Sequence, residues 1–213
     1  MARPHRILPA GVIHHVMNRG SRKGVLFNDR DDYLAFERLL SRAREMFLVR
    51  IIAYCLMSNH WHLLLCPQTA LNLSRFMKWV TGTHATTFRR KTNTVGQGAV
   101  YQARFLALPI EGHFHLVSTW RYIERNPVEA RVVKRAEDWR WSSASLLKRS
   151  CQPARSRPLT MDPPPERLPS DWLKIVNGSF DELVLKYMSH AFDPEVRVER
   201  ATNLSISNEV PSI

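Results

Sequence analysis

The chain has 213 residues, of which 44% are hydrophobic and 23% are charged. This composition is typical of a folded globular protein and disfavours extended disorder. The sequence has no apolar run near the ~18 residues that a membrane span requires, and residues 1–10 lack the apolar core of a secretory signal. Its three cysteines form no C-x-x-C pair, which disfavours a disulfide framework and a structural zinc site. We therefore expect a cytoplasmic protein without a membrane partner.

The net charge is +12, because 31 Lys and Arg side chains outnumber 19 Asp and Glu side chains. The excess is confined to residues 1–150, whose net charge is +14, whereas residues 151–213 carry −2. A basic body with a nearly neutral tail indicates a polyanionic partner, most often nucleic acid. A soluble basic protein without such a partner is the alternative that charge alone leaves open.

Residue patterns in the first third of the chain predict a strand, a helix and a β-hairpin. The helix has Asn28 or Asp29 as its cap, acidic residues in its first turn and apolar residues at helical spacing. β-Branched and aromatic residues mark the strands, and Ser58-Asn59 suits the tight turn of the hairpin. The expected bounds are 12–17 for the first strand, about 29–47 for the helix, and 49–57 and 60–66 for the hairpin strands.

A second helix, a fourth strand and a third helix follow. The expected bounds are 68–90, 99–108 and 111–126, with a loop over 92–98 and a short helix over 128–138. The third helix is expected to end near Pro127, because proline cannot continue the hydrogen-bond ladder. The order β-α-β-β-α-β predicts an α+β fold of the ferredoxin-like type, with an antiparallel sheet and additional C-terminal helices.

The C-terminal part of the sequence differs in composition from the rest. Six prolines over 153–169 predict a linker or an extended crossing arm. Weak helical periodicity continues over Asp171–Ala191. We therefore expect one domain over 1–150 and, over 151–213, a proline-rich linker with a helical, partly mobile extension.

His60-Trp61-His62 is the first pattern that could carry chemistry. In a strand, residues i and i+2 point to the same face about 6.6 Å apart, so the two imidazoles can converge on one ion while Trp61 packs on the other face. Two half-exposed sheet histidines without a ligand are the more common outcome of this pattern alone.

Tyr122 and Asn126 form the second pattern, because an i, i+4 pair lies on one stripe of a helix. The apolar face of this helix centres on Leu116, Trp120 and Ile123, and the pair lies to one side of it. A core tyrosine would lie nearer that centre. A tyrosine at the rim of an amphipathic helix and an asparagine that ends the helix before proline are the alternative explanation.

Three basic segments mix cations with aromatic and loop residues, a combination that suits phosphate contacts and base stacking. Each is weak evidence alone, because runs of charge are usually solvated. The candidate DNA-binding residues in them are Arg19, Arg22, Lys23, Arg89, Arg90, Lys91, Tyr101 and Arg104.

Taken together, these segments resemble a known family. The segment 57–65 resembles the His-hydrophobic-His (HUH) motif of the single-tyrosine transposases that mobilise small insertion sequences. The segment 122–128 resembles the nucleophile helix of the REP-associated tyrosine transposases (REP: repetitive extragenic palindrome). Segments 14–20, 101–105 and 139–143 are also similar to that subgroup, and the resemblance covers about 8–147.

The resemblance implies cleavage and rejoining of single-stranded, hairpin-forming DNA through a 5′-phosphotyrosine. Carried over by position, Tyr122 is the nucleophile, and His60, His62 and Asn126 hold Mg²⁺ or Mn²⁺. The implied partner is a REP-like palindrome, and the implied setting is a bacterial, nucleoid-associated protein that is a monomer or a homodimer.

Some positions depart from the family pattern, and they concern DNA contacts rather than chemistry. Tyr101 replaces the usual tryptophan, Ala103 a frequent glycine, and Glu129 a usual basic residue. The alternative functions are a regulator that binds DNA or RNA hairpins without cutting them, and a ferredoxin-like RNA-binding domain. Tight binding without a covalent adduct would distinguish them from the transposase.

Overall fold

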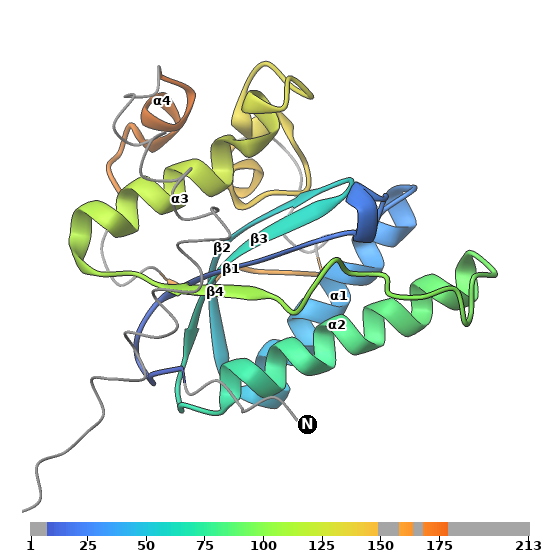
Figure 1. The fold of residues 1–213 in the computed structure, drawn as a ribbon. Helices are drawn as coiled ribbons and strands as arrows, with labels where there is room; N and C mark the ends of the chain where they lie inside the picture. The colour runs from blue at the N-terminus through green and yellow to red at the C-terminus, as the bar shows by residue number, and fades with distance from the viewer. Residues whose placement is uncertain (1–7, 149–157, 164–167, 179–213) are drawn as a thin grey trace, which may run out of the picture. The chain divides into compact units, whose positions relative to one another are not determined.

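The computed structural model describes residues 8–148, 158–163 and 168–178, and their elements follow the expected β-α-β-β-α-β order (Figure 1). The strands form one antiparallel sheet in the order β2-β3-β1-β4, so the predicted ferredoxin-like fold class is confirmed. The strands are β1 (His14–Arg19), β2 (Val49–Met57), β3 (His60–Pro67) and β4 (Leu106–Pro109). The helices are α1 (Arg30–Phe47), α2 (Asn72–Lys91), α3 (Gly112–Glu129) and α4 (Trp172–Asn177).

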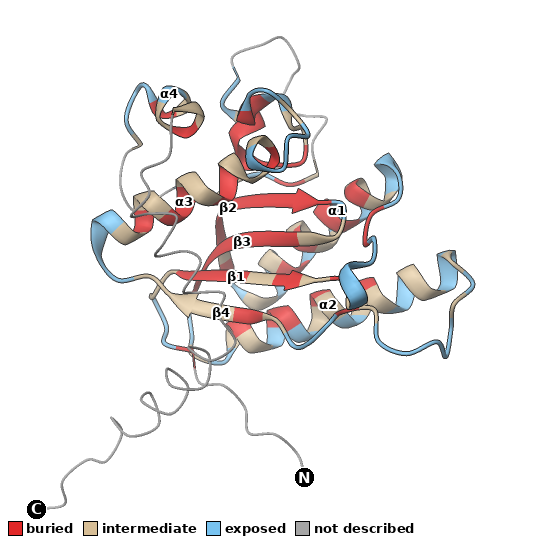
Figure 2. Ribbon diagram, turned by 45° about the horizontal axis from the view of Figure 1, so that its top comes forward, coloured by how far each residue is buried: buried red, intermediate tan, exposed pale blue. Residues whose placement is uncertain are grey.

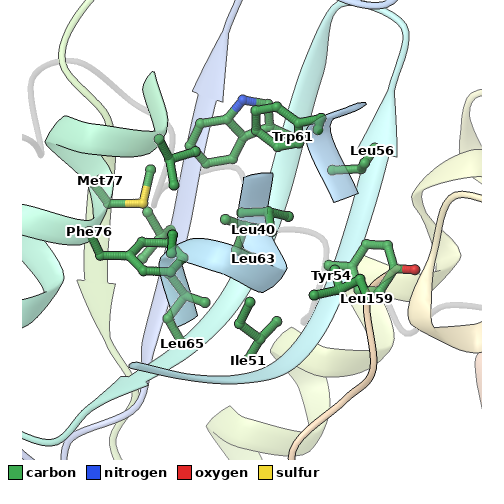
Figure 3. Packing of buried hydrophobic residues seen from close by; sticks show 14 of the residues in the cluster. Leu40, Ile51, Tyr54, Leu56, Trp61, Leu63, Leu65, Phe76, Met77 and Leu159 are labelled. Atoms are coloured by element: carbon green, nitrogen blue, oxygen red, sulfur yellow. The ribbon is translucent and has the colours of Figure 1, made fainter. Parts of the chain in front are cut away.

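Helices cover both faces of the sheet. α1 and α2 lie on one face, and α3 lies on the other (Figures 1 and 2). Along β3, Trp61, Leu63 and Leu65 enter the core beneath α1 and α2, where Figure 3 shows them beside side chains of α2. Leu64 and Cys66 face α3. The period-2 alternation of the strand therefore separates an apolar face from the face that carries His60 and His62.

The fourth strand is shorter than predicted. We expected a strand over 99–108, but β4 begins only at Leu106. The ladder with β1 breaks where the Asn18 side chain donates to the carbonyl of Ala103, and a single bridge between Gly20 and Tyr101 follows. Residues 99–105 therefore cross the end of β1 as an irregular segment.

The third helix is longer than predicted, and the expected end near Pro127 is wrong. α3 continues to Glu129, because proline removes only its own N–H bond, and the last turn is closed by Ala130 N–H donating to the Asn126 carbonyl at 2.9 Å. Arg131 then adopts a left-handed φ of 58°, which ends the helical path. The short helix expected over 128–138 is therefore absent, apart from a 3₁₀ turn at Ala136–Asp138.

Parts of the C-terminal region pack on the body. Residues 158–163 lie along the outer edge of β2, where Asp162 exchanges two hydrogen bonds with the backbone of Ile51. Leu159 is fully buried in the core. The helix expected over Asp171–Ala191 begins as α4, and its remainder lies outside the described residues. In the described part of the chain, no helix has the length and hydropathy of a membrane span.

A chain of polar groups crosses the core between α2 and the sheet. Trp61 Nε1 donates to the hydroxyl of Tyr101 at 3.4 Å, and that oxygen lies 2.7 Å from His84 Nδ1. A hydroxyl that accepts from the indole can donate its own proton to Nδ1, so Tyr101 links Trp61 to His84. Burial lowers the pKa of His84 to about 4, although the nearby carboxylate of Asp32 acts in the opposite direction.

We predict that the neutral imidazole of His84 makes the fold acid-sensitive. Its folded pKa lies below the unfolded value of 6.5, so its contribution to stability is complete above pH 6.5 and is lost as the pH falls toward 4. The loss amounts to roughly 3 kcal/mol from this group. Urea unfolding between pH 7 and 4 should show a shallower pH dependence for His84→Gln than for the wild type. An equal pH dependence of stability in both proteins would show that His84 does not make the fold acid-sensitive.

Candidate active site

β3 presents His60 and His62 toward α3, and each ring has a polar partner at Nδ1. His60 Nδ1 lies 2.7 Å from Asn59 Oδ1, and His62 Nδ1 lies 3.0 Å from His15 Nε2. An amide oxygen can only accept and the contact with Asn59 is the shorter one, so we assign the His60 proton to Nδ1, which leaves a lone pair on Nε2. The two rings are perpendicular, with centroids 5.1 Å apart.

His15 completes the sheet side of the cluster, and its role was not predicted. It stands on β1 opposite Leu64, so it meets His62 diagonally across the two strands. The two rings stack at 5.2 Å, and His15 is only 2% exposed. Burial lowers the pKa of both imidazoles, that of His15 to about 3. Both rings are therefore neutral at pH 7, which is the form that can bind a metal ion.

α3 brings Tyr122 and Asn126 over the same three histidines. The Tyr122 ring meets His62 edge-on at 5.4 Å between centroids and lies 6.1 Å from His15. One turn further on, Asn126 Oδ1 lies 3.1 Å from His60 Nε2, and its Nδ2 lies 3.5 Å from His62 Nε2. The structure thus brings together all four residues predicted for the metal and the nucleophile.

The Asn126 amide lies close to Nε2 of both His60 and His62, and these atoms are candidate donors to a divalent cation. When His62 donates its Nδ1 proton to His15, both Nε2 atoms present lone pairs to the Asn126 amide. Whichever way that amide is turned, its oxygen then faces the lone pair of one imidazole. A cation bound to both Nε2 atoms and to the amide oxygen would satisfy their lone pairs. In an octahedral site with bonds near 2.1 Å, adjacent donor atoms are about 3.0 Å apart.

The types of side chain present restrict which atoms could bind a metal ion. Among the residues that the structure describes, no three His, Cys, Asp or Glu side chains converge as a metal site. Beside His60 and His62, the amide oxygen of Asn126 is a candidate third donor. An amide oxygen is the hard ligand that Mg²⁺ and Mn²⁺ prefer, whereas imidazole favours the softer transition metals.

The groups around Tyr122 shift the pKa of its hydroxyl in opposite directions. Burial raises the pKa of its hydroxyl to about 12, and the neighbouring Cys55 adds to the increase. The positive charge of Arg19 and a hydrogen bond with Asn126 act in the other direction. Arg19 ends β1 directly opposite His60, on the face that carries the cluster. Among the predicted DNA-binding cations, Arg19 is thus the one that the strand pairing places beside the histidine cluster.

The remaining predicted DNA-binding residues fall into four groups. Arg22 and Lys23 are exposed in the turn after β1, which requires Gly20 because a Cβ there would lie 2.1 Å from the Gly24 carbonyl oxygen. Lys91 is paired with Asp29 and Asp32, each at 2.7 Å. Tyr101 is 9% exposed in the core, so its ring does not form an open stacking surface. Arg89, Arg90 and Arg104 line a groove beside α2.

The opposite face of α3 is held by a buried carboxylate. Glu124 Oε1 accepts from Trp120 Nε1 at 3.0 Å and from Ser143 Oγ at 2.6 Å, and its Oε2 accepts from Trp172 Nε1 at 2.7 Å. Burial raises the pKa of Glu124, and these three donors oppose the increase. Arg125 donates to the Val176 carbonyl at 2.8 Å, which adds a second link between α3 and α4. α4 therefore fixes the helix that carries Tyr122.

Comparison with known proteins defines the class: the chain is a DNA transposase. The model of the family described as "Transposase IS200 like" matches residues 10–126, more than half of the sequence. The chain therefore belongs to the IS200-like transposase family, as its motifs predicted. No curated protein matches the sequence.

Two solved structures match this chain. One is a REP-associated tyrosine transposase bound to a REP hairpin; its TM-score is 0.55 at 19% identity, with 72% of this chain and 89% of that chain covered. The other is described as a candidate transposase of Deinococcus radiodurans R1, with a TM-score of 0.39 at 17% identity and 62% and 95% of the two chains covered. The first likeness shows a shared fold.

We predict that Trp172→Phe destabilises the protein by about 1–3 kcal/mol, because it removes the indole N–H that donates to Glu124 Oε2 inside the core. Urea unfolding monitored by circular dichroism measures the change. Lys174→Ala, an exposed position on the same helix, is the control and should cost less than about 0.5 kcal/mol. Equal stability of the two variants would show that α4 does not hold α3 through this carboxylate.

Proposed function

We propose that this transposase cuts and rejoins single-stranded, hairpin-forming DNA with Tyr122 as the nucleophile. The observation that carries the proposal is the meeting of Tyr122 and Asn126 on α3 with His60 and His62 on β3. All four side chains come from one chain, which supports a site that is complete in a monomer. The basic body of the protein suits a DNA partner.

The reaction is an exchange of phosphate esters. The Tyr122 oxygen attacks the scissile phosphorus and forms a 5′-phosphotyrosine, while the 3′ oxygen leaves and takes up the proton that the phenol gives to solvent. A later attack by a 3′-hydroxyl on the phosphotyrosine restores a DNA phosphodiester and the phenol. The bond type is conserved in each step, so the energy of the cleaved bond is retained for rejoining.

The side chains around Tyr122 have separate roles in this reaction. His60, His62 and Asn126 would hold Mg²⁺ or Mn²⁺, which when bound stabilises the charge that develops on the scissile phosphate. Arg19 lies where it can contact a phosphate beside the tyrosine and favours the ionised phenol. Asn126 is hydrogen-bonded to the phenol and so orients it relative to the donor atoms.

The hairpin partner is proposed from the similar transposase, whose structure contains a REP hairpin. Arg22 and Lys23 extend from the turn beside the cluster, where they can bind the phosphates of such a hairpin. A hairpin-binding regulator that does not cut is the alternative, and the following experiment separates it from the proposed enzyme.

We predict that the wild type forms a covalent adduct with a labelled REP-like hairpin in Mn²⁺ and that Tyr122→Phe forms none. His60→Ala should also abolish the adduct but keep hairpin affinity within about threefold, because phosphate contacts supply most of that affinity. Denaturing gels measure the adduct, and fluorescence anisotropy measures binding. An adduct in Tyr122→Phe would refute the nucleophile, and tight wild-type binding without an adduct would favour the regulator.

We predict that His15 is a positioning residue for the metal ligand His62. In the tautomer in which His62 donates from Nδ1, His15 Nε2 accepts that proton and so keeps the lone pair of His62 on Nε2. His15→Phe should weaken Mn²⁺ binding about 10–100-fold. His15→Gln places an acceptor near the same point and should retain most of the affinity.

Electron paramagnetic resonance of Mn²⁺ measures this affinity without turnover, in a Tyr122→Phe background with hairpin DNA bound. Equal affinities for His15→Phe and His15→Gln would exclude the positioning role. A loss in both variants would show that only the imidazole ring fits beside His62.

A further inference from the structure

The basic turn, residues 20–24 after β1, is strained and carries two of the predicted DNA-binding cations. Arg22 and Lys23 are adjacent and exposed, and their φ angles are 53° and 60°. Residues other than glycine adopt this left-handed region at a cost in free energy, so it persists only where surrounding contacts hold it, often at functional sites. The contacts that hold the basic turn therefore show what the strain serves.

The basic turn is anchored to the tight turn between β2 and β3, which lies at the same end of the sheet (Figure 1). Gly20 N–H donates to the Asn59 carbonyl at 2.8 Å, and Leu26 N–H donates to the Ser58 carbonyl at 2.7 Å. The main chain before and after the two cations is therefore fixed on the two residues that directly precede His60, the first proposed metal ligand.

The side chain of Asn59 joins the basic turn to His60. Its Nδ2 donates to the Lys23 carbonyl oxygen at 3.3 Å, and its Oδ1 lies 2.7 Å from His60 Nδ1. A carbonyl oxygen can only accept, so the Lys23 carbonyl selects the end of the amide that faces it. The amide oxygen is thereby turned toward His60, which then carries its proton on Nδ1 and keeps on Nε2 the lone pair that a metal ion needs.

The opposite orientation of the Asn59 amide has the opposite effect on His60. In that orientation the amide nitrogen donates to His60 Nδ1, and the imidazole proton is on Nε2. Nε2 can then donate to Asn126 Oδ1, which lies 3.1 Å away, but it has no lone pair for a cation. The Asn59 oxygen would also face the Lys23 carbonyl oxygen, so the basic turn favours the state in which His60 can bind a metal ion.

We propose that Asn59 is a positioning residue that couples phosphate binding at the basic turn to metal binding at His60. The inference rests on the proposed function, because it takes His60 as a metal ligand and Arg22 and Lys23 as phosphate contacts. A phosphate bound by the two adjacent cations adds a contact that holds the strained turn. The Lys23 carbonyl then keeps the Asn59 amide in the orientation that frees His60 Nε2, so bound DNA raises the affinity for the ion.

The experiment measures how much a REP-like hairpin raises the affinity for Mn²⁺. Tyr122→Phe is the parent, because it should bind the hairpin without cutting it. Electron paramagnetic resonance gives the Kd of Mn²⁺ without DNA and with the hairpin at a concentration that saturates each variant, and the ratio of the two constants is the gain. The parent should show a gain of about tenfold or more. The charge of the scissile phosphate contributes to the gain in every variant, so the variants are compared by the part that they lose.

Two substitutions of Asn59 separate its two hydrogen bonds. Asn59→Asp offers His60 only acceptors, whatever the state of the turn, so it should bind Mn²⁺ without DNA at least as tightly as the parent and lose about threefold or more of the gain. Asn59→Leu keeps neither bond and should weaken Mn²⁺ binding without DNA by about 10–100-fold. Ser58→Ala, at the exposed neighbouring position of the same turn, is the control and should match the parent in both measurements.

Removal of the two cations tests the other end of the coupling. Arg22→Gln/Lys23→Gln removes the phosphate contacts and should lose the same part of the gain as Asn59→Asp. Arg38→Gln/Arg42→Gln removes two charges from exposed positions of α1 and should keep the gain. Adding Asn59→Asp to the turn variant should cause no further loss, because both changes interrupt one connection.

The outcomes separate this inference from the proposed function. A loss of gain in Asn59→Asp that the turn variant shares, and that does not grow when the two are combined, supports the inference. It is overturned when the parent shows no gain, when Asn59→Asp keeps the gain of the parent, when the two losses add, or when Asn59→Leu binds Mn²⁺ without DNA as tightly as the parent. A wild type that forms no adduct, together with this shared loss, refutes the proposed cleavage and leaves the coupling in place.

Discussion

The antiparallel pairing of β1 with β3 is the constraint on which the active site depends. It places Arg19 opposite His60 and sets His15 diagonally from His62, so that a cation and three imidazoles share one face of the sheet. A shift of one residue in this register would turn the histidines into the apolar core beneath α1 and α2. Trp61 stabilises the register, because it is fully buried on that core face.

The order of elements and the alternation along β3 could be predicted from the sequence, because both depend on local periodicity. Strand and helix ends were less predictable, since they depend on contacts between distant residues. The segment 99–105 has strand-like alternation, but Asn18 breaks its ladder with β1. Proline statistics placed the end of α3 too early, because the buried ring of Pro127 packs within a helix whose last turn closes around it.

Spacing within single elements identified the paired histidines and the Tyr122–Asn126 stripe, and the fold brought the two together. The His15–His62 contact could not be found in this way, because it requires the register between two strands that are 47 residues apart in sequence at that contact. Tyr101, by contrast, was predicted as a DNA contact but is buried. Its basic neighbours indicated a surface, whereas its hydroxyl lies within a buried polar chain with Trp61 and His84.

The proposed metal ligands are all uncharged, and this has a thermodynamic consequence. Two neutral imidazoles and one amide leave the full double charge of a cation unbalanced, and Arg19 adds to it. At such a site, the substrate phosphodiester would supply counter-charge to the cation. Binding of cation and DNA would then be reciprocal, because each would raise the affinity for the other by the same factor. The site would hold its ion weakly without DNA, so its occupancy would report that the target is bound.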